Sequence, residues 1–300
     1  MPPPNKTSTQ SPPSPLSGSY SSTTELKGGE RRKAKLGPEP TLLSRRQVDA
    51  LYSLLGAVTD ALKKLEIPYI LTGGSLLGAI RQHSILFCDD DIDLAILESE
   101  DDSRSSMYER AKSQLPLLLG DEYQYSIRPW EGGDKVRMKS TSNVHLDIFV
   151  IRKYNNIDQL MDVIGVKANG QKQSNQYVQG ILDVIKNALH SQGEQKSSIA
   201  LNGNDANLQL PCPIWHFNTR KAIELWPKEV YRTAELFPTI QNLKMGPVTG
   251  LSGPRTPVLL LKRAFNTDCF DVYYQSIGHG DKYAIEDEPT KPTSNLPPRV

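Results

Sequence analysis

Residues 71–96 read LTGGSLLGAIRQHSILFCDDDIDLAI and hold the strongest pattern in the chain. A Gly-Gly-Ser turn at 73–75 precedes an acidic segment, DIDL at 91–94, by sixteen residues. Backbone N–H groups left open by glycines, together with a hydroxyl, suit a phosphate group. Carboxylates that converge beside such a turn suit Mg²⁺, which prefers oxygen ligands. The stretch therefore predicts chemistry at a phosphorus atom.

Apolar periodicity on both sides of this stretch predicts alternating helices and strands. Ser44 and Gln47 form the pattern of a capping box, and apolar residues at three- and four-residue spacing predict a helix from there to about Glu66. The further elements expected are a strand at 67–71, a helix at 75–81, a strand at 91–96, a helix at 105–119, and strands near 123–128, 135–139 and 144–151. This alternation is typical of a small α/β or α+β sheet.

Two-residue spacing places Asp91 and Asp93 on one face of their strand, opposite apolar neighbours. Asp147 lies in a second acidic strand, VHLDIFV at 144–150, whose other face is apolar. If the two strands are neighbours, Asp147 stands beside the first two carboxylates. Converging carboxylates of this kind can share one metal ion or bracket two.

A calcium loop is the competing site. Asp89, Asp91, Asp93 and Glu100 stand at loop positions 1, 3, 5 and 12, but the sharp turn at position 6 demands glycine and the chain has Leu94 there. We therefore reject calcium. A merely solvated acidic run would not explain why Asp93 sits inside a hydrophobic strand.

Charge and cysteine content exclude several classes of protein. Lys and Arg total 35 against 34 for Asp and Glu, so no net field attracts nucleic acid or anionic lipid. Cys88, Cys212 and Cys269 match neither a zinc pattern nor a disulfide framework, which fits a reducing compartment. No apolar run reaches the roughly 18 residues of a membrane helix, and the first ten residues have no signal-peptide core. We expect a soluble, cytoplasmic protein.

Composition also divides the chain. The proline- and serine-rich beginning cannot bury enough apolar surface to offset its ordering entropy, so we expect it to be disordered. The polar middle region contains one further expected helix, at 177–190. The expected regions are a disordered tail at 1–40, a catalytic core at 41–151, a polar, partly helical insertion at 152–212, a C-terminal lobe of the same domain at 213–280, and a flexible tail at 281–300.

The glycine turn, the acidic strand and the later Asp147 together resemble the nucleotidyltransferase superfamily. Within it, GSLLGAIR at 74–81 and DDDID at 89–93 are similar to the LicD/fukutin family, and ELFP at 235–238 resembles part of that family's C-terminal half. The resemblance implies an α/β (α+β) fold: a nucleotidyltransferase-like core sheet with a helical insertion and a C-terminal lobe.

The resemblance also implies an activity. Members of the family transfer a phosphorylated alcohol, such as phosphocholine, ribitol phosphate or a sugar phosphate, from a nucleotide-linked donor to a glycan hydroxyl. The reaction would depend on Mg²⁺ (or Mn²⁺), with Asp91 and Asp93 as metal ligands, Asp147 as the third acid and Asp89 as a supporting carboxylate. Eukaryotic members often act in the secretory pathway, so that compartment remains open by analogy.

The expected donor phosphate site consists of Gly73, Gly74, Ser75 and Arg81. An arginine at a helix end suits a structural salt bridge equally well, so the role of Arg81 has two interpretations.

Three further polar residues receive no site role. Lys135 and Arg137 share a strand face; contact with phosphates is one interpretation, but we favour a solvated face. His145 has no His or Cys partner at ligand spacing, so we do not assign it to a metal.

Two other functions remain open. One is a nucleotidyltransferase that uses a nucleoside triphosphate to modify RNA, protein or a small molecule; the balanced charge argues mildly against RNA. The other is a catalytically silent binding module. For the transferase activity that we favour, the expected partners are a nucleotide-linked donor and a glycan or glycoconjugate acceptor, with no nucleic acid.

Overall fold

The computed structural model describes residues 43–86, 89–98, 106–128, 133–141, 143–165, 172–190, 213–265 and 269–270, and two short strands at 272–273 and 291–292. All of these belong to one compact unit that spans 37–300. The expected disordered tail at 1–40 lies outside the described residues, as does most of the expected flexible tail at 281–300.

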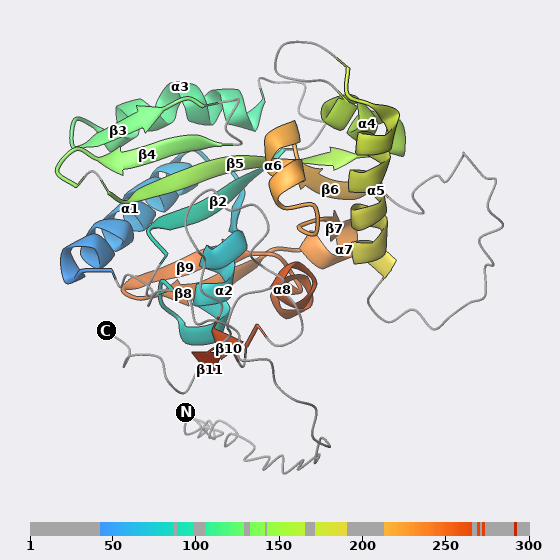
Figure 1. Cartoon of the computed structure of the whole chain (residues 1–300). Coiled ribbons are helices and arrows are strands. Elements are labelled where there is room, and N and C mark those ends of the chain that lie inside the picture. Colours follow the sequence, from blue (N-terminus) through green and yellow to red (C-terminus); the bar gives the residue numbers. More distant parts are fainter. Residues whose placement is uncertain are drawn as a thin grey trace, which may run out of the picture. The chain divides into compact units, whose positions relative to one another are not determined.

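The first elements follow the expected order (Figure 1). Helix α1 (Arg45–Lys64) begins at the expected capping box, in which Gln47 N donates to Ser44 Oγ and Ser44 N donates to Gln47 Oε1. Strand β1 (Tyr69–Leu71), helix α2 (Gly73–Gln82) and strand β2 (Asp91–Glu98) come next. Helix α2 starts two residues earlier than predicted because both glycines belong to its first turn.

The remaining elements, in chain order, are α3 (Met107–Leu119), β3 (Tyr123–Ser126), β4 (Asp134–Met138), β5 (His145–Tyr154), α4 (Ile157–Gly165), α5 (Asn175–His190), β6 (Ile214–Phe217), α6 (Arg220–Leu225), β7 (Tyr231–Arg232), α7 (Thr233–Leu236), β8 (Ile240–Met245), β9 (Val248–Gly253), α8 (Pro257–Phe265), β10 (Val272–Tyr273) and β11 (Lys291–Pro292). The helix expected at 177–190 is confirmed as α5, and the boundary expected at residue 151 falls inside β5. Residues 191–212 of the expected insertion lie outside the described part of the chain.

The main sheet is mixed. Its order is β1-β2-β5-β4-β3, and β2 and β5 are parallel while their outer neighbours are antiparallel. Strand β5 is long enough to pair with β4 along its first half and with β6 along its second, and β7 extends the sheet beyond β6. Strands of the expected C-terminal lobe therefore continue the core sheet, and the α/β (α+β) prediction is confirmed.

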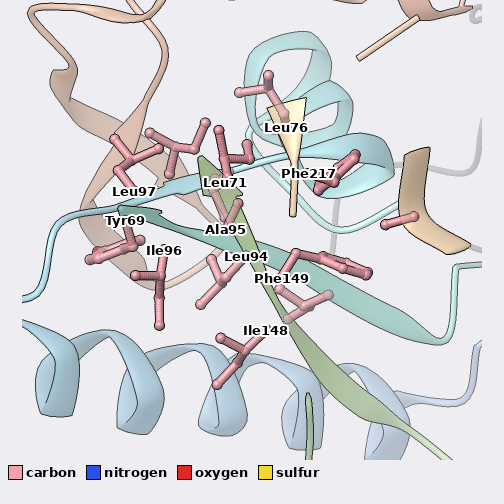
Figure 2. Close-up of a cluster of buried hydrophobic side chains, with 14 of the residues drawn as sticks. Tyr69, Leu71, Leu76, Leu94, Ala95, Ile96, Leu97, Ile148, Phe149 and Phe217 are labelled. Carbon is pink, nitrogen blue, oxygen red and sulfur yellow. The ribbon is translucent and has the colours of Figure 1, made fainter. Parts of the chain in front are cut away.

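Helix α1 covers one face of the central strands. Figure 2 shows Ile96 and Ile148 pointing toward this helix, and both side chains are at most 1% exposed. Phe149 points to the other face, where its ring packs edge-on against those of Phe217 and Trp226. Apolar residues on both faces fit a central parallel strand pair that is buried on both sides.

Helix α2 lies on the face of the sheet opposite α1 (Figure 1). The C-terminal lobe packs against α2 through α8 and β8, and against β1 through β9. Among the described residues, every helix is too short or too polar to cross a lipid bilayer.

Candidate active site

The acidic strands meet as expected. In the parallel pairing of β2 with β5, Asp93 lies directly opposite Asp147, and Asp91 lies opposite His145. All four side chains belong to the face that carries α2, because residues two apart on a strand share a face. The predicted neighbourhood of Asp147 and the two earlier carboxylates is confirmed.

Three of these side chains form a group that could hold a metal ion. Asp91, His145 and Asp147 each offer one ligand atom, and these atoms lie within 4.8 Å of one another. His145 Nε2 is 3.6 Å from both Asp91 Oδ2 and Asp147 Oδ1. His145 was not assigned to a metal because it has no His or Cys partner at ligand spacing. Its partners in this group are carboxylates, Asp91 on the neighbouring strand and Asp147 two residues along the chain.

The donor atoms of this group fit a divalent cation. Asp147 Oδ1 is buried and has no hydrogen-bond partner among the described residues. A buried carboxylate oxygen without a donor is costly, and a cation shared with Asp91 would satisfy it. Carboxylate oxygens suit Mg²⁺ and Mn²⁺.

The Asp93 carboxylate lies against the first turn of α2. Gly73 has a φ of +54°, and a Cβ there would stand 2.7 Å from Asp93 Oδ2, so glycine is required on both counts. Burial, reinforced by the charges of Asp91 and Asp147, raises the pKa of Asp93 well above its usual range. Asp93 is outside the three-residue group but adds negative charge beside it.

Asp89 is the fourth carboxylate of the cluster. A side chain at Gly74 would collide with Asp89 Oδ2, so this carboxylate also lies at the start of α2. Burial and the neighbouring charge of Asp91 raise the pKa of Asp89 well above its usual range. A divalent cation would stabilise such an accumulation of acidic groups.

Two hydrogen bonds attach the glycine turn to β2. Ser75 Oγ accepts from Asp93 N at 2.8 Å, and Thr72 N donates to Asp93 O at 3.2 Å. Thr72 is the N-cap of α2, yet it makes no side-chain cap bond. The first-turn N–H groups of Gly74 and Ser75 are therefore not capped by Thr72, which is the condition for anion binding at a helix N-terminus.

Glu229 explains why Thr72 does not cap the helix. The Thr72 hydroxyl donates to Glu229 Oε2, and Gly73 N donates to the same oxygen at 3.4 Å. Glu229 is 4% exposed, and burial raises its pKa. Sequence reasoning missed this carboxylate because it lies 156 residues beyond Gly73 and carries no local motif.

Arg81 and Lys135 have different surroundings. Arg81 Nη1 donates to Cys269 O at 3.2 Å, which ties the end of α2 to the C-terminal lobe. The phosphate-binding role expected for Arg81 remains a prediction.

For Lys135 the expected solvated face is wrong. Its side chain is only 17% exposed and its Nζ donates to Asp147 Oδ2 at 2.9 Å, because β4 is hydrogen-bonded to β5 beside the acids.

A comparison with protein families matches the region of the chain that carries the site. Residues 66–179 match the family described as LicD/FKTN/FKRP, nucleotidyltransferase domain. Uncharacterized protein RP689 of Rickettsia prowazekii (strain Madrid E) is 31% identical over 114 residues, and the match spans 38% of this chain and 38% of that protein.

Among solved structures, terminal uridylyl transferase 4 from Trypanosoma brucei with bound CTP is similar over 56% of this chain and 58% of its own chain, at 13% identity and a TM-score of 0.24. At that TM-score the likeness adds nothing to the description of the fold. The match over 66–179 covers β1, α2, β2 and β5, the elements that carry the glycine turn and the paired acids. Residues 66–179 are therefore similar to the nucleotidyltransferase domain of the LicD/FKTN/FKRP family, which supports the resemblance seen in the short motifs.

Proposed function

We propose that the protein is a Mg²⁺- or Mn²⁺-dependent transferase. It moves a phosphorylated alcohol, of the phosphocholine, ribitol-phosphate or sugar-phosphate type, from a nucleotide-linked donor to a glycan hydroxyl. One observation carries the proposal: the register that sets Asp93 opposite Asp147 places the acids beside a helix N-terminus that Thr72 leaves uncapped. Metal ligands and a phosphate-binding turn then serve the same phosphorus atom.

In this proposal Asp91 and Asp147 hold the divalent ion, with His145 as a neighbour and Asp93 and Asp89 as supporting carboxylates. When bound, the ion neutralises the charge that develops on the transferred phosphate. The supporting acids add the negative charge that attracts the ion to the site.

The start of α2 binds the donor in the proposal. The N–H groups of Gly74 and Ser75 donate hydrogen bonds to a phosphate of the nucleotide-linked substrate, and the positive end of the helix dipole adds to the attraction. Gly73 lets the turn approach Asp93 without a Cβ between them. Arg81 completes the proposed set, and it also ties α2 to the lobe through Cys269.

The transfer is a displacement at the cargo-side phosphorus. The acceptor oxygen forms a bond to that phosphorus, and the bond to the oxygen of the nucleotide phosphate breaks. The acceptor proton passes to water, and the electron pair of the broken bond leaves with a nucleoside monophosphate. CMP or GMP is the expected leaving group.

A product assay tests this function. The purified full chain is incubated with CDP- and GDP-linked alcohols, and separately with nucleoside triphosphates, each with Mg²⁺ or Mn²⁺ and a panel of glycan acceptors. We expect CMP or GMP to appear together with a phosphorylated glycan. Pyrophosphate from a triphosphate, with no monophosphate from any linked donor, would instead support the triphosphate-using nucleotidyltransferase.

Two controls sharpen the assay. Asp91→Asn should remove the monophosphate signal, whereas Asp121→Asn, which changes an exposed acid in the turn before β3, should leave it intact. Signal retained in Asp91→Asn would point to a contaminating enzyme, and loss of signal in both variants would point to general instability. Binding of linked donors without any turnover would favour the silent binding module.

A further inference from the structure

Lys135 introduces an ammonium group into the acidic cluster. Its Nζ donates to Asp147 Oδ2 at 2.9 Å and to His145 Nε2 at 2.7 Å. The side chains of Lys135 and Asp147 are only 17% and 13% exposed. Water screens such a pair less than it screens a surface ion pair, so the attraction between the two charges is stronger. The ion pair therefore restricts both side chains.

The register of the sheet holds Lys135 in this place. Lys135 lies opposite Asp147, which lies opposite Asp93, so the three residues form one row across β4, β5 and β2. The next residue, Val136, is fully buried and lies opposite Leu146. A slip of one residue would send Val136 to the polar face, so apolar packing fixes the position of the ammonium.

The ammonium gives the two oxygens of Asp147 different roles. Oδ2 accepts the bond from Lys135, whereas Oδ1 has no hydrogen-bond partner among the residues that the structure describes. Oδ1 is therefore the atom left for a cation shared with Asp91. A second divalent ion on Oδ2 would either displace the ammonium of Lys135 or lie in contact with it. Two positive charges in contact repel each other strongly.

We propose that Lys135 takes the place of a second metal ion, so that each chain binds one divalent ion where two-metal phosphoryl-transfer sites bind two. The inference rests on the proposed function, because it describes how that site balances its carboxylates. Lys135 acts as a positioning residue: it holds Asp147 so that Oδ1 faces Asp91, and it keeps positive charge beside the transferred phosphate.

The test counts metal ions on the full-length protein. Mn²⁺ binding is measured by isothermal titration and by electron paramagnetic resonance, without donor or acceptor, for the wild type and three variants. Lys135→Met removes the charge at nearly constant length, Lys135→Arg retains it, and Lys244→Met makes the same chemical change at an exposed lysine of β8.

We expect one Mn²⁺ per chain in the wild type, in Lys135→Arg and in Lys244→Met. Lys135→Met should bind a second ion, or bind the single ion at least about tenfold more tightly, because a nearby positive charge has been removed. Its transfer rate at saturating Mn²⁺ should nevertheless fall by about tenfold or more. If Lys135 had only a structural role, its loss would weaken both metal binding and turnover. Stronger metal binding together with slower turnover therefore identifies the positioning role.

Each alternative outcome is decisive. Two ions in the wild type, or weaker or unchanged Mn²⁺ binding in Lys135→Met, would overturn the inference and leave the transferase proposal standing. No ion in the wild type would overturn both. One ion with no transfer from any linked donor would overturn the proposed function alone. If Lys135→Met unfolds, Lys135→Gln replaces it, and the wild-type count still tests the proposal.

Discussion

Strands β2 and β5 contain two regions of opposite character within one parallel pairing. Their first residues alternate: Asp91, Asp93 and Asp147 are half-buried, while the residues between them are buried. From Leu94 and Ile148 onward both faces of the pair are buried over several residues. The same two strands thus supply a polar site and the centre of the core.

The difference shows how the molecule keeps carboxylates close together. Asp93 and Asp147 are direct cross-strand neighbours, and like charges in that position destabilise a sheet. The apolar pairs that follow, such as Leu94 with Ile148, bury their side chains completely or nearly so. Burial of the second region therefore offsets repulsion in the first.

Removing a charge from the polar region should have the largest effect on function and little effect on stability. Asp91→Asn and Asp93→Asn should each lower turnover by more than about 100-fold, because the first removes a proposed metal ligand and the second removes a supporting carboxylate beside it. The melting temperature should stay the same or rise, since one repelling charge is gone. Rates at saturating Mg²⁺ and thermal unfolding measure the two properties; near-wild-type rates would show that the metal assignment is wrong.

Cutting into the apolar region should do the reverse. Ile148→Ala removes a side chain that is 1% exposed and should lower the free energy of unfolding by about 3 kcal/mol. At a temperature where the variant is folded, it should lose far less activity than Asp91→Asn. Urea unfolding gives the free energy, with Leu117→Ala as control: Leu117 is 80% exposed, and its loss should cost less than about 0.5 kcal/mol. Equal losses at the two positions would contradict the burial described.

The glycine turn that lies against Asp93 of the polar region should respond to a single methyl group. Gly73→Ala should cost about 1–2 kcal/mol, because alanine disfavours the positive φ and its Cβ would press on Asp93. Donor affinity should fall as well. Gly56→Ala is the matched control, because a Cβ at Gly56 in α1 would meet nothing within 4 Å and should stabilise the helix by about 0.5–1 kcal/mol. Chemical denaturation and donor titration measure both effects, and a neutral Gly73→Ala would show that the turn is not under constraint.

The smallest effect expected is a pH dependence of metal stabilisation. The pKa values of Asp89, Asp93 and Glu229 are raised, so without an ion the folded chain binds protons more tightly than the unfolded chain. Stability from these groups is present at low pH and is lost as the pH rises from the ordinary carboxyl pKa, about 4, through the raised values. Metal binding needs ionised carboxylates. The gain in melting temperature from Mn²⁺ should therefore be greater at about pH 7.5 than at about pH 5.5.

Asp91→Asn is the control for that measurement, since it should reduce the Mn²⁺ gain at both pH values. A gain in the wild type that does not change with pH would mean that the ion binds without displacing protons from these carboxyls.

Elements with a local signal were predicted well. Ser44 and Gln47 lie three residues apart, so a capping box can be recognised within one helical turn. The shared face of Asp91 and Asp93 follows from the two-residue period of a strand. The family resemblance also rested on short contiguous motifs, and the match over 66–179 bears it out.

The partners of the site residues had no such signal. Lys135 was interpreted as solvated because its own strand gives no indication of which neighbour it pairs with, and the antiparallel pairing of β4 with β5 places it beside Asp147. His145 acquired its role from Asp91 on the adjacent strand. Glu229 reaches α2 only because the chain returns to it from the C-terminal lobe.

The sequence by itself determined the periodic elements, the glycine turn and the face on which each acid stands, because helices and strands repeat over a few residues. Only the tertiary structure decided that Lys135 shares Asp147 with the candidate metal site and that Glu229 holds Thr72 away from capping α2. Those contacts depend on strand register and on how the C-terminal lobe packs against α2. Burial of apolar residues determines both, and these apolar residues lie away from the polar groups that make the contacts.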